Sequence, residues 1–216
     1  MKNPAWDNLE SRNEIRKAAF LLFRKIGYKT TSYSMIAEES KQGRPLVQYY
    51  YPKKEEIALE FLVEAMQTIL SQLESDRQAD AMVATLHFGQ LYYTFLLYDE
   101  DMRRFTKEVL ENRSVTSRLV QLNAKWSLPE SETAEDEERI TSASIRATGG
   151  VYELLYLQLQ DGSAKEPAEY AVRNVADFYA ATGTATYDET LRHLEENLLP
   201  DKQVEEYMKS LFQTLF

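Results

Sequence analysis

The sequence predicts an all-α fold in which three short helices and a longer connecting helix precede a helical body. Apolar residues recur at spacings of three and four along most of the chain, which is the period of a helix with one buried face. Glycine and proline are sparse, at 7 and 6 of 216 residues, so a network of β-turns is not expected. An apolar fraction of 44% is sufficient for a real core.

The first three helices follow from local start and stop signals. Asn13 to Ile26 carries an apolar face at helical spacing, and Gly27 is well placed to end the helix in a left-handed conformation. Ser32 is the expected N-cap of a second short helix. After a three-residue break, a third helix starts near Arg44, and Pro45 suits its first turn because its missing N–H removes no hydrogen bond.

The remaining chain is expected to be helical almost throughout. Pro52 ends the third helix, and the long connecting helix starts near Lys53. Linkers rich in glycine, proline or acidic residues separate the later helices. These helices are predicted at Ala79–Tyr98, Glu100–Asn112, Val115–Trp126, Glu135–Gln160, Pro167–Thr182, Tyr187–Leu198 and Lys202–Leu215.

Charge is distributed unevenly along the chain. The net charge is −10, yet residues 1–60 hold 11 basic and 8 acidic residues. Between Arg12 and Lys54 the balance is ten basic residues against three acidic ones. A basic N-terminal segment on an acidic body is typical of a module that binds a polyanion. The alternative is a solvated surface with no specific partner.

Several function classes find no support in the sequence. The chain has no cysteine, which excludes disulfides and thiolate chemistry and fits a reducing cytoplasm. Its two histidines are far apart, and it has no glycine-rich phosphate loop and no metal-ligand spacing. No signal-peptide core and no apolar run of roughly 18 residues is present. We therefore expect a cytoplasmic protein that is not an enzyme, with no cofactor, no metal and no membrane partner.

The N-terminal helices have the pattern of a helix-turn-helix, in which the second helix of the pair enters the major groove of DNA. This arrangement explains three consecutive tyrosines. Successive helical residues point about 100° apart, so three neighbours cannot share one surface. Tyr51 lies one turn after Val47 and is expected to face the core, whereas Tyr49 and Tyr50 are expected to face outward.

The stretches "AAFLLFRKIGYKTTSYSMIAEES" and "LVQYYYPKKEEI" resemble the DNA-binding domain of the TetR family of bacterial transcriptional regulators, over about residues 11–60. The sequence departs from the family pattern at the turn, where Lys41 and Gln42 precede Gly43 although the family usually has glycine near position 41. The family commonly has a small residue at position 45, where this chain has Pro45, and tyrosine at position 48, where it has Gln48. The matching features are Gly27-Tyr28, Thr31-Ser32, Ile36-Ala37-Glu38 and the ending Pro52-x-Lys54-Glu55.

The resemblance implies a DNA-binding domain over residues 1–56, with its motif at about 32–51, and a helical ligand-binding and dimerisation domain over 57–216. Arg can bond bidentately to guanine and Gln to adenine, while hydroxyls and Lys fix register on the phosphates. Carried over by position, the phosphate contacts are Ser32, Ser34, Tyr49, Tyr50 and Lys54, and the base-reading residues are Arg44, Leu46 and Gln48.

The helical body offers a candidate ligand pocket, because pockets are mostly apolar with a few converging polar groups. The alternative is that the aromatic residues fill the core and each polar tip finds a local partner. The candidate pocket residues are His87, Gln90, Tyr93, Thr94, Trp126, Arg146, Tyr152 and Tyr156.

Dimerisation is expected because a helix-turn-helix that reads a palindrome needs two copies. The resemblance implies a four-helix bundle with two helices from each subunit, and Glu135–Gln160 and Pro167–Thr182 are the candidates. Ala143, Ala147 and the pair Gly149-Gly150 are small enough for close helix approach. The resulting interpretation is a homodimeric repressor released from a palindromic operator by an unknown small molecule. The alternative is a helical scaffold protein whose basic head binds an acidic partner.

Overall fold

The computed structural model describes residues 9–73, 80–126 and 133–216, and the chain is all-α in these segments, which confirms the predicted fold class. Most helix boundaries lie within two residues of those predicted. The helices are α1 (Leu9–Ile26), α2 (Tyr33–Glu39), α3 (Arg44–Tyr50), α4 (Lys54–Leu73), α5 (Ala81–Leu96), α6 (Glu100–Leu110), α7 (Arg113–Trp126), α8 (Ala134–Asp161), α9 (Pro167–Thr182), α10 (Tyr187–Glu196) and α11 (Asp201–Leu215).

The predicted start and stop signals act as expected in the N-terminal helices. The Ser32 hydroxyl accepts a hydrogen bond from the Met35 N–H at 3.3 Å and so caps α2. Pro45 lies in the first turn of α3, and Gly27 follows α1 with a φ of +94°. Helix α1 differs from the prediction because it begins at Leu9, four residues before the expected start at Asn13.

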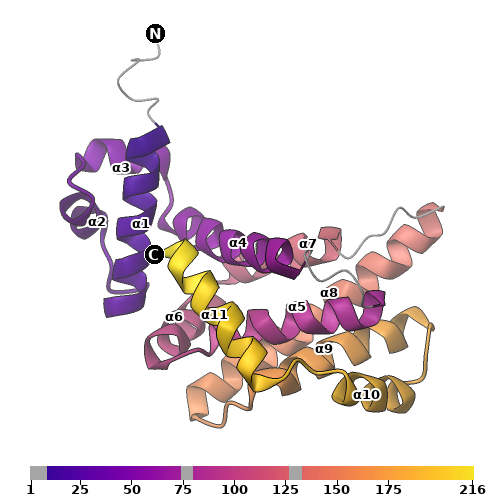
Figure 1. The fold of residues 1–216 in the computed structure, drawn as a ribbon. Coiled ribbons are helices and arrows are strands. Elements are labelled where there is room, and N and C mark those ends of the chain that lie inside the picture. The colour runs from indigo at the N-terminus through magenta and orange to yellow at the C-terminus, as the bar shows by residue number, and fades with distance from the viewer. Residues whose placement is uncertain (1–8, 74–79, 127–132) are drawn as a thin grey trace.

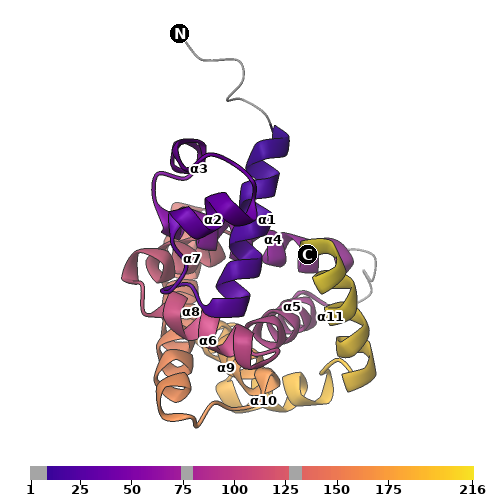
Figure 2. The same cartoon turned by 90° about the vertical axis from the view of Figure 1, so that its left-hand side faces the viewer.

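The helices are arranged in two groups joined by α4 (Figure 1). Helices α1 to α3 form one end of the molecule, and α4 leads from them into the body. In the body, α9 packs between α5 and α8, and α7 packs on α8. Helix α10 covers α9, and α11 then runs back along α4 and α5, so that the last residues lie beside α1 (Figures 1 and 2).

One apolar core extends through both groups of helices. Ile15, Ile36 and Val47 are fully buried between α1, α2 and α3. The same cluster of buried residues continues through Phe61 on α4 into the body. The division of the chain at residue 56 therefore does not coincide with a gap in the core, and it stays a prediction.

Helix α6 closes the C-terminal end of α1 with polar contacts. The Arg104 Nη2 donates to the Arg24 carbonyl oxygen at 2.6 Å, and the Lys29 N–H donates to the Glu108 Oε2 at 2.8 Å. The Lys29 Nζ forms an ion pair with Glu111 at 2.5 Å. The φ of +94° at Gly27 favours glycine, and a Cβ there would lie 2.9 Å from both Glu108 carboxylate oxygens, so a side chain would displace this carboxylate.

We predict that Gly27→Ala lowers the free energy of unfolding by about 2 kcal/mol or more, because it combines left-handed backbone strain with displacement of the Glu108 carboxylate. Gly162→Ala is the matched control, since Gly162 has a φ of +76° but nothing within 4 Å of its added Cβ. The control should cost about 1 kcal/mol, from backbone strain alone. Urea denaturation of both variants measures the difference, and equal costs would contradict the role of Glu108.

Candidate functional site

The inward face of α3 is as predicted. Val47 is fully buried and Tyr51 is 2% exposed, so both belong to the core. The Tyr33 hydroxyl donates to the Tyr51 carbonyl oxygen at 2.9 Å, which fastens α2 to the end of α3. Burial, with a smaller contribution from Glu60, raises the pKa of Tyr51 to about 12, so its phenol stays neutral. The core contacts thus fix which face of α3 is turned to solvent.

The outward face of α3 presents Arg44, Gln48 and Tyr49, all of which are exposed. Tyr49 meets Tyr50 edge to face, with ring centroids 5.4 Å apart. Tyr50 and Leu46 are only half-exposed and pack against the core on one side. A guanidinium, an amide and a phenol are therefore available on one surface of this short helix.

The start of α2 lies on the exposed surface as well. Ser32 and Ser34 are both exposed, but their hydroxyls are placed differently. The Ser32 oxygen accepts the capping bond from α2, which leaves its O–H as a donor. Ser34 follows two residues later in the first turn. Both can donate to a phosphate that approaches this end of α2.

The turn between α2 and α3 departs from the family pattern in sequence and places a lysine in the left-handed region. Lys41 adopts a φ of +54° and is, among the described residues, the only non-glycine residue with a positive φ. Gly43 has a φ of −69°, which any residue adopts. Lysine thus occupies the left-handed position that glycine usually takes, at a cost of about 1 kcal/mol.

Four of the ten basic residues between Arg12 and Lys54 form ion pairs within the molecule. Arg12, Arg16, Arg24 and Lys29 pair with carboxylates of α4 and of the two residues that cap α6, at 2.5 to 2.8 Å. Near the helix-turn-helix, the described part of the chain provides no carboxylate partner for three exposed cations, and these carry the positive charge of this surface. They are Lys41, Arg44 and Lys53.

Lys54 lies differently from the expected phosphate contact. Its Nζ donates to the Tyr28 and Thr31 carbonyl oxygens at 2.7 and 2.8 Å and lies 4.5 Å from the centroid of the Tyr28 ring. Burial lowers the pKa of this ammonium group. Lys54 therefore ties the start of α4 to the loop between α1 and α2, whereas its neighbour Lys53 is exposed.

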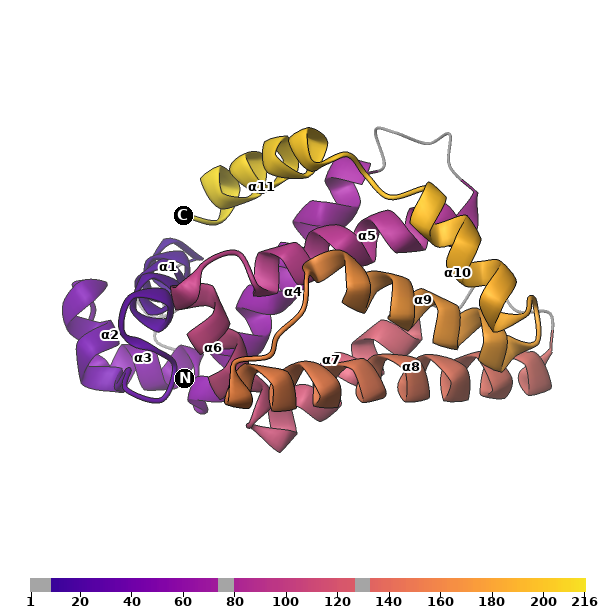
Figure 3. The same ribbon diagram turned by 90° about the horizontal axis from the view of Figure 1, so that it is seen from below.

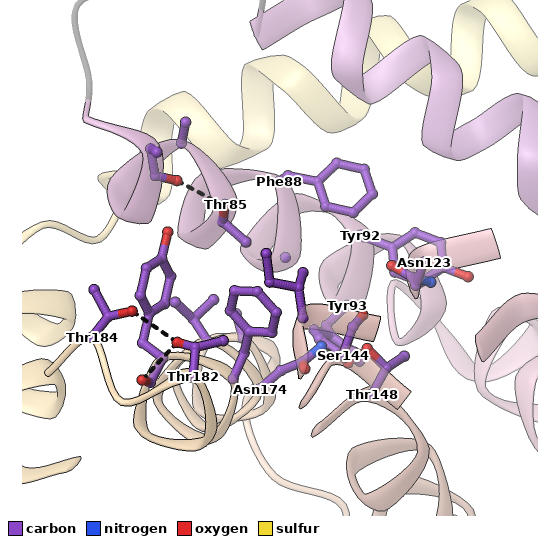
Figure 4. Close-up of a pocket in the computed structure, with 18 of the residues that line it drawn as sticks. Thr85, Phe88, Tyr92, Tyr93, Asn123, Ser144, Thr148, Asn174, Thr182 and Thr184 are labelled. Carbon is purple, nitrogen blue, oxygen red and sulfur yellow. Dashed lines mark hydrogen bonds between the residues drawn. The ribbon is translucent and has the colours of Figure 1, made fainter. Parts of the chain in front are cut away.

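The body contains a cavity of about 590 Å³ between α5, α8 and α9 (Figure 4). Its wall is rich in aromatic rings, and Tyr92 and Asn123 lie toward one end with Thr182 and Thr184 at the other. The wall that α5 provides comprises Ala81, Ala84, Thr85, Phe88, Gly89, Tyr92 and Tyr93, which recur at the three-and-four spacing of a single helix face.

Buried phenols form the polar part of this wall. The Asn174 amide donates to the Tyr93 hydroxyl at 3.0 Å, and the Tyr152 hydroxyl donates to the Tyr92 hydroxyl at 3.4 Å. Burial raises the pKa of Tyr92 and Tyr93 well above the usual value and raises that of Tyr152 to about 12. All three therefore remain neutral.

Charge is almost absent from the cavity wall. Within the described lining, Arg139 is the only charged side chain. Its Nη2 lies 2.9 Å from Asp136 Oδ1, and its Nη1 donates to the Thr182 carbonyl oxygen. The wall thus offers apolar surface and neutral hydrogen-bonding groups.

Two of the eight predicted pocket residues, Tyr93 and Tyr152, line this cavity. His87, Gln90 and Thr94 lie on the opposite face of α5, because they fall between the positions that face the cavity. The His87 Nε2 lies 2.9 Å from the Asn197 carbonyl oxygen.

Gln90 and Thr94 are likewise engaged with local partners. Gln90 forms two bonds with the backbone of Leu199, accepting from its N–H at 2.9 Å and donating to its carbonyl oxygen at 3.1 Å. The Thr94 hydroxyl donates to the Gln90 carbonyl oxygen at 2.7 Å. His87 and Gln90 thus hold the chain beyond α10 against α5.

The remaining three predicted pocket residues do not contribute to the described wall. Arg146 is exposed, and its Nε donates to the Ser142 carbonyl oxygen at 3.3 Å. Tyr156 is half-buried, and its hydroxyl accepts from the Gln160 amide at 2.6 Å. The side chain of Trp126 lies outside the described residues.

Residues 15–61 match a family model described as "Bacterial regulatory proteins, tetR family". The N-terminal domain is a TetR-family helix-turn-helix. This match supports a DNA-binding transcriptional regulator of that family. A search of curated proteins found no match to it.

Two other kinds of feature are absent from the described residues. Among the described residues, no group of three or more His, Cys, Asp or Glu side chains lies close enough to hold a metal ion. No helix in the described part of the chain is long and apolar enough to cross a membrane. The described helices thus present two features with functional geometry, namely the exposed face of α3 and the body cavity.

We predict that Lys41→Gly raises the free energy of unfolding by about 1 kcal/mol, because glycine adopts the left-handed conformation without strain. The matched substitution is Gly43→Ala at the N-cap of α3, which relieves no left-handed strain and should lower stability by about 0.5–1 kcal/mol. At Gly43 the φ is negative, and an added Cβ would meet nothing nearer than Pro45 Cδ at 3.8 Å. Thermal and urea unfolding test both, and a destabilised Lys41→Gly would contradict the strain.

Proposed function

We propose that this regulator is a homodimeric repressor that leaves a palindromic operator when a small uncharged molecule fills the body cavity. The cavity carries the proposal, because it is large, mostly apolar and lined only by residues that follow the helix-turn-helix in the chain, with none from α3. A volume of about 590 Å³ falls within the range of roughly 300–1,000 Å³ that small-molecule sites occupy. A regulator that binds bacterial DNA would act in the cytoplasm.

Arg44 and Gln48 are the proposed base readers, because both are exposed on the outward face of α3 and carry groups that suit guanine and adenine. Leu46 is half-buried and offers an apolar edge, which suits a thymine methyl group. Tyr49 and Tyr50 flank this face, and their hydroxyls are proposed to contact phosphates.

Around this face, Ser32 and Ser34 are proposed to contact phosphates from the start of α2. For the connector helix we propose Lys53 in place of Lys54. The ammonium group of Lys54 is bound to backbone carbonyls, whereas Lys53 is exposed and has no carboxylate partner in the described chain. Lys41, in the turn, is a further candidate of the same kind.

Dimerisation is proposed through α8 and α9. Helix α8 runs unbroken through Gly149 and Gly150, and a Cβ at either position would meet nothing within 4 Å. Ile145 and Leu157, which are 42% and 50% exposed, lie on the same side of α8 as Gly149. Small residues between exposed apolar ones would allow a second copy to approach closely. A two-fold dimer would present two α3 helices to the two half-sites.

The effector is proposed to be uncharged because the cavity would leave a charged group without a partner. No carboxylate is found in the described wall, and Arg139 is already paired with Asp136. Burying an unpaired charge is strongly unfavourable. Aromatic rings and neutral phenols suit a molecule with an apolar ring system and one or two hydrogen-bonding groups.

The principal test is selection of binding sites from a random pool of double-stranded DNA by the full chain. We expect an inverted repeat whose half-site centres are about one helical turn apart, bound with strong salt dependence. Analytical ultracentrifugation should show two chains on each duplex. Equal binding of all duplexes and of poly-glutamate would contradict the proposal and support a scaffold with a basic head.

We predict that Arg44→Ala and Lys53→Ala weaken DNA binding in different ways. Arg44→Ala should lose about 1–3 kcal/mol on the selected duplex and relax the preference at one base pair of each half-site. Lys53→Ala should weaken all duplexes similarly and reduce the salt slope by about 1 for each chain bound. Fluorescence anisotropy over a salt series measures both quantities, and identical behaviour of the two variants would refute the assignment.

We predict that the neutral fluorophore N-phenyl-1-naphthylamine binds once per chain and that Ser144→Phe abolishes this binding. Ser144 is 2% exposed and lines the cavity, so a phenyl ring there would occupy part of its volume. Gln121→Phe, on the exposed face of α7, adds the same ring outside the cavity and should bind the probe normally. Equal probe binding by both variants would exclude the cavity as the site.

A further inference from the structure

Helix α11 returns from the body to the DNA-binding helices. It lies along α4 and α5, and its last turn ends beside α1 (Figures 1 and 3). Two phenylalanines stand at this end, Phe212 and Phe216, with parallel rings whose centroids are 5.8 Å apart. These rings face the same side chain of α1.

That side chain is Arg24. Its guanidinium carbon lies 4.9 Å from the centroid of the Phe212 ring and 5.5 Å from that of Phe216, within the range of a cation–π contact. Its Nη2 also lies 2.5 Å from Asp99 Oδ2, at the start of α6. One residue of the DNA-binding domain is therefore held by three groups of the body.

The two phenylalanines are themselves anchored in the body. The Phe216 ring meets Phe61 of α4 edge to face at 5.8 Å. The Phe212 ring lies 5.7 Å from Phe95 of α5 and 4.4 Å from Tyr98. A cation–π contact to rings fixed in this way restrains both the position and the direction of α1.

The other end of α11 is fixed as well. The backbone of Leu199, two residues before α11, exchanges two hydrogen bonds with the Gln90 side chain of α5, a side chain that is only 5% exposed. His87 bonds the Asn197 carbonyl oxygen one turn earlier on α5. Helix α11 is thus attached to the body at its base and to α1 at its tip.

We infer that α11 is a strap that sets the orientation of the DNA-binding helices on the body, and that Arg24, Phe212 and Phe216 are positioning residues for operator recognition. Recognition of two half-sites requires each α3 to have a defined direction. Loss of the strap would leave α1 to α3 folded but allow them several orientations. The apparent affinity for an operator then falls in proportion to the fraction in the reading orientation.

The test uses the absence of cysteine in the chain, which allows dyes to be attached at two chosen positions. Glu39→Cys on α2 and Lys165→Cys in the loop before α9 are both exposed. Donor and acceptor dyes on this pair, in chains diluted with unlabelled protein, report the distance between the DNA-binding helices and the body by single-molecule energy transfer. This readout requires neither an operator nor an effector.

Arg24→Gln and Phe216→Leu should broaden the energy-transfer distribution at temperatures well below the unfolding midpoint. They should also lower affinity for the duplex selected by the unmodified chain by about tenfold. Arg24→Lys should fall between Arg24→Gln and the unmodified chain, because lysine keeps the charge but loses the planar stacking of guanidinium on the rings. Arg24 is partly exposed, so these variants are expected to fold.

Leu155→Ala is the control for stability alone. Leu155 is fully buried in α8 and takes no part in the aromatic group around Arg24. It should lower the unfolding midpoint without broadening the distribution. Gln213→Ala, on the exposed face of α11, should change neither quantity. A narrow, unshifted distribution in Arg24→Gln and Phe216→Leu, or the same broadening in Leu155→Ala, would overturn the inference. Broadening with unchanged DNA affinity would overturn the positioning role.

Discussion

The packing of the DNA-binding helices on the body depends on the ring of Phe61 in α4. This ring is 1% exposed, and its centroid lies 4.1 Å from that of Phe20 in α1. The centroids of Phe105, Phe95 and Phe216 lie 5.5, 5.6 and 5.8 Å from it. Because rings in such a cluster interlock at defined angles, the DNA-binding helices have a packed seat on the body rather than a flexible tether.

The two faces of helix α5 make different contacts in the body. One face lines the cavity through residues such as Phe88 and Tyr93, while Gln90 on the other face holds the chain that enters α11. The wall of the cavity receives none of its described residues from α1, α2 or α3. Any influence of a bound molecule on DNA reading would therefore pass through helices such as α4 and α6, which both contact α1.

The helices were largely predictable because their signals are local. Both ends of α9 follow from Pro167 and Gly183, and the 100° rotation per residue is sufficient to place Val47 and Tyr51 inward. The cavity was not predictable in the same way. Both faces of α5 are apolar with polar interruptions, so the sequence does not tell which one faces α9. The choice between Lys53 and Lys54 likewise depends on carbonyl groups of a loop more than twenty residues away.

The contact of α6 with Gly27 has a consequence for building chimaeric regulators. If the DNA-binding helices were exchanged by a cut near residue 56, the contact of Gly27 with the Glu108 carboxylate would be lost. The contacts of Arg24 with the Phe212 and Phe216 rings would be lost as well. The new α1 would then pack on α6 and α11 side chains that do not match it. Successful grafts would carry matching residues at the α6 and α11 contacts, so the exchangeable unit is defined by these surfaces and not by a stretch of sequence.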